Sequence, residues 1–426
     1  MTSLRWCTHT LVAVVAALAA VSCGGTGGTG GTSSTGSSTA SPSVASVAMT
    51  CQTTTPFAGA PMHAALPASA FPASAGAATP AIALPDTLTA LLDQRLHEIL
   101  QQTGAPALSA AIAIPGLGRW SSSQGMAQVV PPQTVDGSTE FIWGSVTKAF
   151  TAVLVLQLVQ EGKLRLDDPV SRWYPQLPQA QRITIAHLLN HSSGLQTNTV
   201  DPLGLGTATP VQQLAALANM PLLFCPGTNA SYSNAGYLVL GLVVEAIEQQ
   251  PFYQSVQQRI ALPLNLLHLR VLRPGEDMPA TLAIPHDGRT PKVELGISTR
   301  LGVGDLVGRA DDMVIAWEAV LSGKLLLPAT VQAQWALLYS LDAPGAEAGQ
   351  ANRWFGKGVM LFEWTDELGH ARTWLGHTGG IAHANALMAY DHTADAYTAV
   401  AVNSTVSSLA VANALLKVVM EWRATQ

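Results

Sequence analysis

The sequence Ser145-Val146-Thr147-Lys148 places a hydroxyl group three residues before an amine, at the start of a long apolar run. In a helix, residues i and i+3 lie on the same face, so the amine of Lys148 can reach the hydroxyl of Ser145. The chain has six lysines, and only Lys148 follows a serine at this spacing. A hydroxyl group beside a basic amine is a typical activated nucleophile. The pattern therefore predicts a serine acyl-transfer enzyme in which Ser145 and Lys148 are catalytic.

A structural alternative is that Ser145 caps the amino end of the helix that follows. Capping would explain the serine but not the lysine, because a cation in the first turn opposes the helix dipole. Residues 149–159 are apolar on nearly every side, which predicts a buried helix. A lysine at the head of a buried helix needs a reason that capping does not supply.

Two further motifs follow along the chain. Tyr232-Ser233-Asn234 precedes a second apolar helical run, and His377-Thr378-Gly379-Gly380 lies between two strand-like segments. In this order, the motifs S-x-x-K, Y-x-N and H-T-G resemble those of the serine β-lactamase and penicillin-recognising family. That family includes class C β-lactamases, D-alanyl-D-alanine carboxypeptidases and related esterases. The resemblance extends over residues 85–426, with similar flanking segments at 141–151, 183–195 and 262–266.

The resemblance implies a role for each motif. Tyr232 would be the third catalytic residue, and either Lys148 or Tyr232 would be the principal base. The implied substrate-binding residues are Asn234, His377, Thr378 and Gly379. The implied oxyanion hole consists of the backbone N–H groups of Ser145 and Gly380. Two structural alternatives stay open, namely a helix N-cap at Asn234 and a hairpin turn at the paired glycines.

The first position of the third motif departs from the β-lactamase pattern, since many β-lactamases have lysine where this chain has His377. Histidine there is more similar to some carboxypeptidase, peptidase and esterase members. A histidine with an ordinary pKa of about 6.5 is partly charged at pH 7, so we expect a protonated His377 to bind a substrate carboxylate.

The predicted function is a serine hydrolase that forms a covalent acyl-enzyme. D-alanyl peptides, β-lactams and small esters remain open as substrates, because each presents an acyl carbon to the same serine. The alternative is a non-catalytic penicillin- or cell-wall-binding lipoprotein. The family resemblance implies no cofactor.

The amino terminus predicts export and a lipid anchor. Arg5 precedes a short apolar run at 11–21, and Cys23 follows small residues as in a bacterial lipobox. We therefore expect residues 1–22 to be a signal peptide and Cys23 to be lipidated, facing the periplasm or cell exterior. A plain signal peptidase site is the alternative. Residues 23–84 are rich in Gly, Ser, Thr, Ala and Pro, which predicts a disordered tether.

Composition and the remaining candidate residues argue against two kinds of partner, nucleic acid and metal ions. A net charge of −6 with 11% charged residues argues against binding of nucleic acid. His187 and His191 have metal-ligand spacing, but Leu188 stands where a zinc protease has its glutamate. We therefore expect packing or hydrogen-bonding roles for both histidines and no metal. Cys51 and Cys225 are left as a possible disulfide. The sequence gives no indication of oligomeric state.

Residues 85–426 are long enough for one large domain with two lobes. Strand patterns occur near both ends of this region, and helical periodicity dominates residues 148–285. The sequence predicts helices at 86–102 and 404–422, and strands at 107–114, 119–127, 357–363, 384–390 and 397–402. The expected fold is α+β, with an antiparallel sheet flanked by helices and an inserted helical lobe, as in β-lactamase/transpeptidase-like proteins. The three motifs would meet between sheet and lobe.

Overall fold

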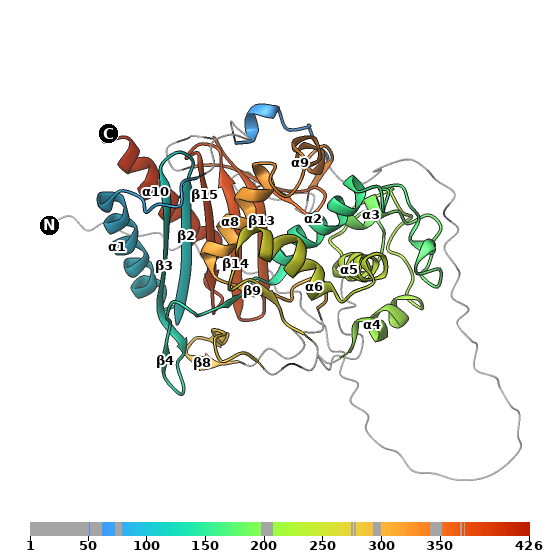
Figure 1. Ribbon diagram of the computed structural model, residues 1–426, viewed down its shortest axis with the longest axis horizontal. Coiled ribbons are helices and arrows are strands. Elements are labelled where there is room, and N and C mark those ends of the chain that lie inside the picture. The colour runs from blue at the N-terminus through green and yellow to red at the C-terminus, as the bar shows by residue number, and fades with distance from the viewer. Residues whose placement is uncertain are drawn as a thin grey trace, which may run out of the picture. The chain divides into compact units, whose positions relative to one another are not determined.

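Strands from both ends of the folded region form one antiparallel sheet (Figure 1). The computed structural model describes residues 51, 62–72, 79–196, 208–273, 276, 278–292, 300–340, 352–366, 369 and 371–426. Within these residues the sheet has ten strands in the order β1-β10-β11-β12-β13-β14-β15-β2-β3-β4. Their bounds are Met62–His63 (β1), Ala107–Ile114 (β2), Gly118–Gln128 (β3), Gln133–Thr134 (β4), Leu338–Ser340 (β10), Asn352–Phe355 (β11), Met360–Thr365 (β12), Ala371–Ile381 (β13), Ala384–Asp391 (β14) and Ala396–Val402 (β15).

Both faces of the central strands are covered, which explains why β2 is apolar without alternation. Alternate side chains of a strand point to opposite faces. On one face, Leu108 and Ile112 pack with helices α1 (Asp86–Thr103) and α10 (Ser408–Arg423). On the other face, Ala111 lies in the core that contains Trp317 of α8 (Ala310–Leu321). Every residue of β2 is therefore buried.

The helical lobe lies beside the sheet in Figure 1, where α3, α4, α5 and α6 gather next to α2. Helix α2 is buried over its whole first part, from Thr147 to Leu156. The helices outside the sheet layers are α2 (Thr147–Gln160), α3 (Ile185–Leu189), α4 (Pro210–Leu217), α5 (Asn234–Glu248), α6 (Phe252–Val256), α7 (Leu262–Leu264) and α9 (Pro328–Gln334). Two small sheets complete the described part of the structure. One consists of β5 (Phe141–Ile142), β9 (Leu306–Gly308) and β6 (Arg270–Val271), and the other of β7 (His286–Asp287) with β8 (Thr290–Pro291).

The predicted α+β architecture is confirmed. The first helix ends one residue later than predicted and β2 has the predicted bounds, whereas the last helix, predicted at 404–422, spans Ser408–Arg423. The strand predicted at 357–363 begins at Met360 instead, because Gly358 has a φ of +75° and interrupts the extended backbone.

Part of the segment predicted to be a disordered tether packs on the domain. Strand β1 pairs with β10, and the ring of Phe71 lies 5.5 Å from that of Trp335. The backbone N–H of Thr79 donates to Glu318 at 2.7 Å, in a buried position. The tether prediction is therefore wrong for residues 62–72 and 79–84. An apolar anchor such as Phe71 repays the ordering entropy that a polar segment cannot.

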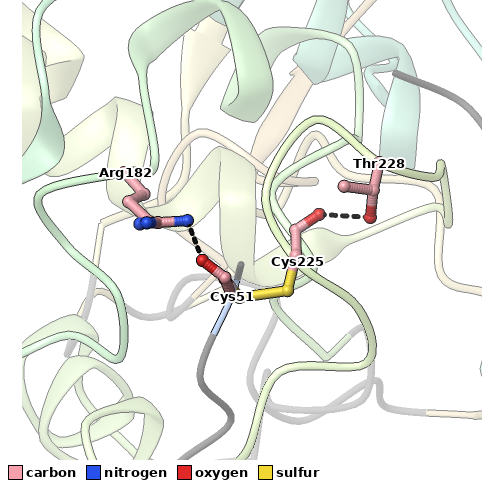
Figure 2. Close-up of a disulfide and its surroundings, with 4 residues drawn as sticks. All are labelled: Cys51, Arg182, Cys225 and Thr228. Carbon is pink, nitrogen blue, oxygen red and sulfur yellow. Dashed lines mark hydrogen bonds between the residues drawn. A yellow bond between two sulfur atoms is a disulfide. The ribbon is translucent and has the colours of Figure 1, made fainter. Parts of the chain in front are cut away.

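Cys51 and Cys225 form a disulfide, with Cα atoms 5.4 Å apart (Figure 2). The bond joins the N-terminal segment to the loop that precedes the Y-x-N motif. Arg182 donates a hydrogen bond to the carbonyl of Cys51, and the hydroxyl of Thr228 donates to the carbonyl of Cys225 at 2.7 Å. The sequence left this bond open as a possibility, and the structure contains it.

The predicted signal peptide at 1–22 and the lipidation site Cys23 lie outside the described residues, as do 24–50, 52–61 and 73–78 of the predicted tether. In the part of the chain that the structure describes, no helix has both the length and the apolar character needed to cross a membrane.

Candidate active site

Ser145 and Lys148 meet at the head of α2, as the i, i+3 spacing predicts. Ser145 lies in a 3₁₀ turn at Gly144–Val146, and Lys148 lies in the first turn of α2. Lys148 Nζ is 2.9 Å from Ser145 Oγ. The residue at the N-cap position of α2 is Val146, and no side chain caps this helix. The capping alternative for Ser145 is therefore wrong.

Lys148 is completely buried. Its Nζ donates to the carbonyl oxygen of Val303 at 2.9 Å and lies 5.0 Å from the centre of the Tyr232 ring. Burial holds the pKa of Lys148 well below its usual value. The nearby cation Arg300 lowers this pKa further, and Asp305 acts weakly in the opposite direction. Since burial penalises the ammonium form, the amine is available as a proton acceptor.

A loop at 302–306 holds the head of α2 in place. The hydroxyl of Thr151 donates to the carbonyl of Gly302 at 2.7 Å, and the hydroxyl of Thr147 accepts from the N–H of Leu306 at 3.1 Å. The Val303 carbonyl lies between these contacts and binds Lys148. Sequence reasoning missed this loop, because it accepts the hydrogen bond of Lys148 with a backbone carbonyl that any residue could supply.

Tyr232 also contacts Ser145. It is half-buried and immediately precedes α5, and its hydroxyl shares a hydrogen bond with the Ser145 side chain. Burial raises the pKa of Tyr232 above its usual value, whereas the contact with Ser145 lowers it by less. The phenol is therefore protonated at neutral pH and can donate a hydrogen bond.

Asn234 is the first residue of α5, not its N-cap. The cap is Ser233, whose hydroxyl accepts from the N–H of Gly236 at 3.1 Å. No hydrogen bond joins Asn234 to Lys148 among the described residues. Instead, Asn234 Oδ1 is buried and has no partner within that part of the chain. An orphaned acceptor beside Tyr232 is suited to bind a donor on a substrate.

The third motif lies in strand β13, so the hairpin-turn alternative is wrong. His377 and Gly380 pair in register with Met388 and Asn385 of β14. Gly379 lies so close to the Ser145 turn that a Cβ there would be 1.9 Å from the carbonyl oxygen of Trp143. A side chain at position 379 would push the strand away.

The backbone amides predicted to form an oxyanion hole lie close together. A Cβ on Gly379 would be 3.0 Å from the nitrogen of Ser145. Gly144 has a φ of +51°, and a Cβ on it would be 2.9 Å from the nitrogen of Gly380. The glycines on both segments thus permit this close approach. Thr378, the other predicted binding residue, donates its hydroxyl to the Met360 sulfur at 3.4 Å.

His377 is buried, and its charge differs from the expectation. Its Nδ1 lies 2.5 Å from the carbonyl oxygen of Thr378, and Nε2 has no partner among the described residues. Burial is the main cause that lowers the pKa of His377 to about 3. The imidazole is therefore neutral throughout the neutral pH range. In the free protein His377 therefore lacks the charge expected from the sequence, because the sequence does not reveal burial.

The two histidines with metal-ligand spacing do not share a site. His187 Nδ1 accepts from the N–H of Thr184 at 3.3 Å and completes the cap of α3. The ring of His191 stacks on Tyr232, with centroids 4.5 Å apart. No group of three metal-ligating side chains is found among the described residues.

The lowered pKa of Lys148 has a consequence for stability that Lys148→Met tests. Up to about pH 10.4 the unfolded chain holds a proton on this lysine, whereas the folded protein releases it at lower pH. Between these two pKa values the unfolded state binds more protons, so the free energy of unfolding increases with pH. The Lys148→Met protein lacks this contribution. We expect wild type to gain stability relative to Lys148→Met from about pH 7 to about pH 9.5, measured by urea denaturation.

Lys324→Met, which removes an exposed lysine, is the matched control and should follow wild type at both pH values. A stability difference between wild type and Lys148→Met that is constant with pH would show that the folded protein keeps the lysine charged.

Comparisons with known proteins agree with this arrangement. The sequence profile of the Beta-lactamase family matches residues 92–419. The esterase EstB of Burkholderia gladioli is 31% identical over 296 residues, which are 59% of this chain and 74% of the esterase. Penicillin-binding protein 4 of Amycolatopsis lactamdurans is 34% identical over 150 residues, which are 34% of this chain and 39% of that protein.

Among solved structures, D-amino acid amidase from Ochrobactrum anthropi SV3 superimposes with a TM-score of 0.68, covering 78% of this chain and 99% of the amidase at 24% identity. This similarity shows the fold. Together with the family match over most of the chain, it establishes that the protein belongs to the beta-lactamase family and is a serine hydrolase of that fold.

Proposed function

We propose that the protein hydrolyses small, uncharged carboxylic esters through a covalent acyl-enzyme on Ser145. The observation that carries the choice of substrate is the buried, neutral His377, where many β-lactamases have a lysine. Penicillins and D-alanyl peptides both carry a carboxylate, and a neutral imidazole supplies no charge to bind it. The similarity to the esterase EstB supports the same choice.

In the proposed acylation step, Ser145 Oγ attacks the ester carbonyl, and its proton passes to the neutral amine of Lys148. The 2.9 Å separation of Oγ and Nζ supports this transfer without rearrangement. The N–H groups of Ser145 and Gly380 would bind the negative oxygen of the tetrahedral intermediate. A lysine held in its neutral form is the principal base, because the protonated phenol of Tyr232 has no free negative charge.

The leaving alkoxide then takes the phenolic proton of Tyr232, which recovers a proton from the Lys148 ammonium. In deacylation, water attacks the acyl carbonyl and gives its proton to the Lys148–Tyr232 pair. The pair then protonates Ser145 Oγ as its bond to the acyl carbon breaks, which releases the acid and free Ser145. Asn234 Oδ1, which has no partner among the described residues, would accept a hydrogen bond from the substrate.

The alternative of a non-catalytic binding protein is less well supported. A protein that only traps an acyl group needs Ser145 but has no use for a proton donor at the leaving group. Both Lys148 and Tyr232 contact Ser145, and burial disfavours the charged form of each.

Intact-protein mass spectrometry with a p-nitrophenyl ester, penicillin G and a D-alanyl-D-alanine peptide tests the proposal. The ester should acylate wild type and turn over, whereas the two carboxylate substrates should react slowly. Ser145→Ala should remove both the adduct and hydrolysis, because it lacks the attacking oxygen. Lys148→Met should lower turnover by about a hundredfold or more, as is typical for loss of a positioned base. Rapid turnover of penicillin G, or ester hydrolysis by Ser145→Ala, would contradict the proposal.

The neutral state of His377 predicts a flat pH dependence of substrate selectivity. The ratio of kcat/KM for an uncharged ester to that for a carboxylate-bearing ester should be constant between about pH 5.5 and about pH 8, because His377 does not titrate there. His377→Lys should shift the ratio toward the carboxylate substrate. Steady-state rates of both esters at each pH measure it. A ratio that changes with an apparent pKa near 6.5 would show that His377 is protonated during binding.

We also propose that the protein is exported and anchored to a membrane by lipid on Cys23. The disulfide between Cys51 and Cys225 supports export, because such bonds persist mainly in oxidising compartments. Wild type expressed in bacteria should partition into detergent and lack residues 1–22, whereas Cys23→Ser should carry no lipid and keep its signal peptide. Phase partitioning and N-terminal mass analysis measure both. A soluble, unlipidated wild type would rule out the anchor.

A further inference from the structure

His191 holds the chain on both sides of Tyr232. Its carbonyl oxygen accepts a hydrogen bond from the N–H of Ser231 at 3.0 Å, and its ring Nδ1 accepts from the N–H of Ser233 at 3.0 Å. One residue thus binds the backbone immediately before and immediately after the tyrosine.

The ring of His191 also stacks on Tyr232, at a centroid distance of 4.5 Å and an interplanar angle of 29°. Phe355 and Tyr237 hold the imidazole in turn, at centroid distances of 4.9 Å and 5.1 Å. His191 is buried, with 2% of its surface exposed. Its contacts restrict the backbone and the ring plane of Tyr232 together.

The ring is held in one tautomer. A backbone N–H can only donate, so Nδ1 must be unprotonated and the ring proton lies on Nε2. Nε2 is itself buried without a partner in the described part of the chain. Because burying an unpaired polar group is costly, an apolar side chain would be preferred here for packing alone.

The backbone of His191 has a left-handed conformation, with a φ of +61°, which glycine adopts freely and other residues adopt uncommonly, asparagine, aspartate and histidine more often than the rest. A histidine at such a position carries a conformational cost. The unpaired Nε2 and the left-handed backbone are both understandable if the imidazole ring has a function that a residue without these costs could not perform.

We propose that His191 is a positioning residue, which sets the orientation of the Tyr232 phenol toward Ser145 and the leaving group. The proposal rests on the proposed function, because it assumes that Tyr232 protonates the leaving group. His191 itself touches neither the substrate nor the reacting atoms.

The leaving group provides a readout that a general loss of stability would not change. An ethyl ester needs a proton on its leaving alkoxide, whereas p-nitrophenolate leaves without one. Poor positioning of Tyr232 should therefore slow ethyl ester hydrolysis more than p-nitrophenyl ester hydrolysis. Rates are divided by the amplitude of the p-nitrophenolate burst from acylation, which measures the concentration of active enzyme. An unfolded fraction of a variant therefore does not affect the result.

Two variants separate the contacts of His191. His191→Asn fits the left-handed backbone and keeps an acceptor for the N–H of Ser233 but removes the stacked ring, and His191→Gly removes both at no backbone cost. We expect His191→Asn to lower the ratio of ethyl to p-nitrophenyl kcat/KM by about tenfold, a part of what full loss of a general acid costs, and His191→Gly to lower it at least as far. His187→Asn, which alters the neighbouring histidine that does not stack on Tyr232, should leave the ratio unchanged.

A double-mutant cycle with Tyr232→Phe completes the test. If His191 acts through Tyr232, adding His191→Asn to Tyr232→Phe should cause no further loss in the ratio. Additive losses, or a His191→Asn protein that behaves like His187→Asn, would overturn the inference while leaving the proposed function intact. If Tyr232→Phe alone leaves the ratio unchanged, the proposed role of Tyr232 fails, and the inference fails with it.

Discussion

The burial of the Lys148 amine beside Ser145 is the condition on which the rest of the site depends. A lysine in water is an ammonium ion that can only donate hydrogen bonds. Here the apolar helix α2 and the rings of Tyr232 and Tyr237, at 5.0 Å and 5.9 Å, exclude water from Nζ. The pKa of Lys148 is lowered in consequence. The apolar run after Ser145 is thus more than core packing, because it makes the lysine a base.

The same exclusion of water acts on the neighbouring groups. Burial raises the pKa of Tyr232 and lowers that of His191, and it lowers the pKa of His377 to about 3. Burial therefore disfavours the charged form of all four side chains in the free protein. Charge arises only during the proposed reaction, as an ammonium on Lys148 and an oxyanion at the backbone amides. In surroundings of low polarity this pair attracts strongly, which favours the transition state over the resting site.

The sequence could predict those contacts of the site that are local in the chain, and it could not predict those between distant residues. The contact between Ser145 and Lys148 follows from helix geometry, since both residues lie within one turn, and the strand β2 follows from its composition. The Val303 carbonyl lies 155 residues from Lys148 and leaves no trace in side-chain identity. His377 was found from its motif, but its charge was not, because burial by Phe355 and the sheet depends on the complete fold.

The N-terminal segment shows a second limit of sequence reasoning. Its composition predicts a spacer, yet Cys51 is bonded to Cys225, seven residues before Tyr232. The same loop is fixed at Gly227, whose N–H donates to the carbonyl of Ser192, next to His191. The residues that carry Tyr232 are therefore attached on one side to the N-terminal segment and on the other to the segment that contains His191. A chain that keeps its cysteines reduced loses the first attachment, so the link between the Tyr232 loop and the N-terminal segment requires oxidising surroundings.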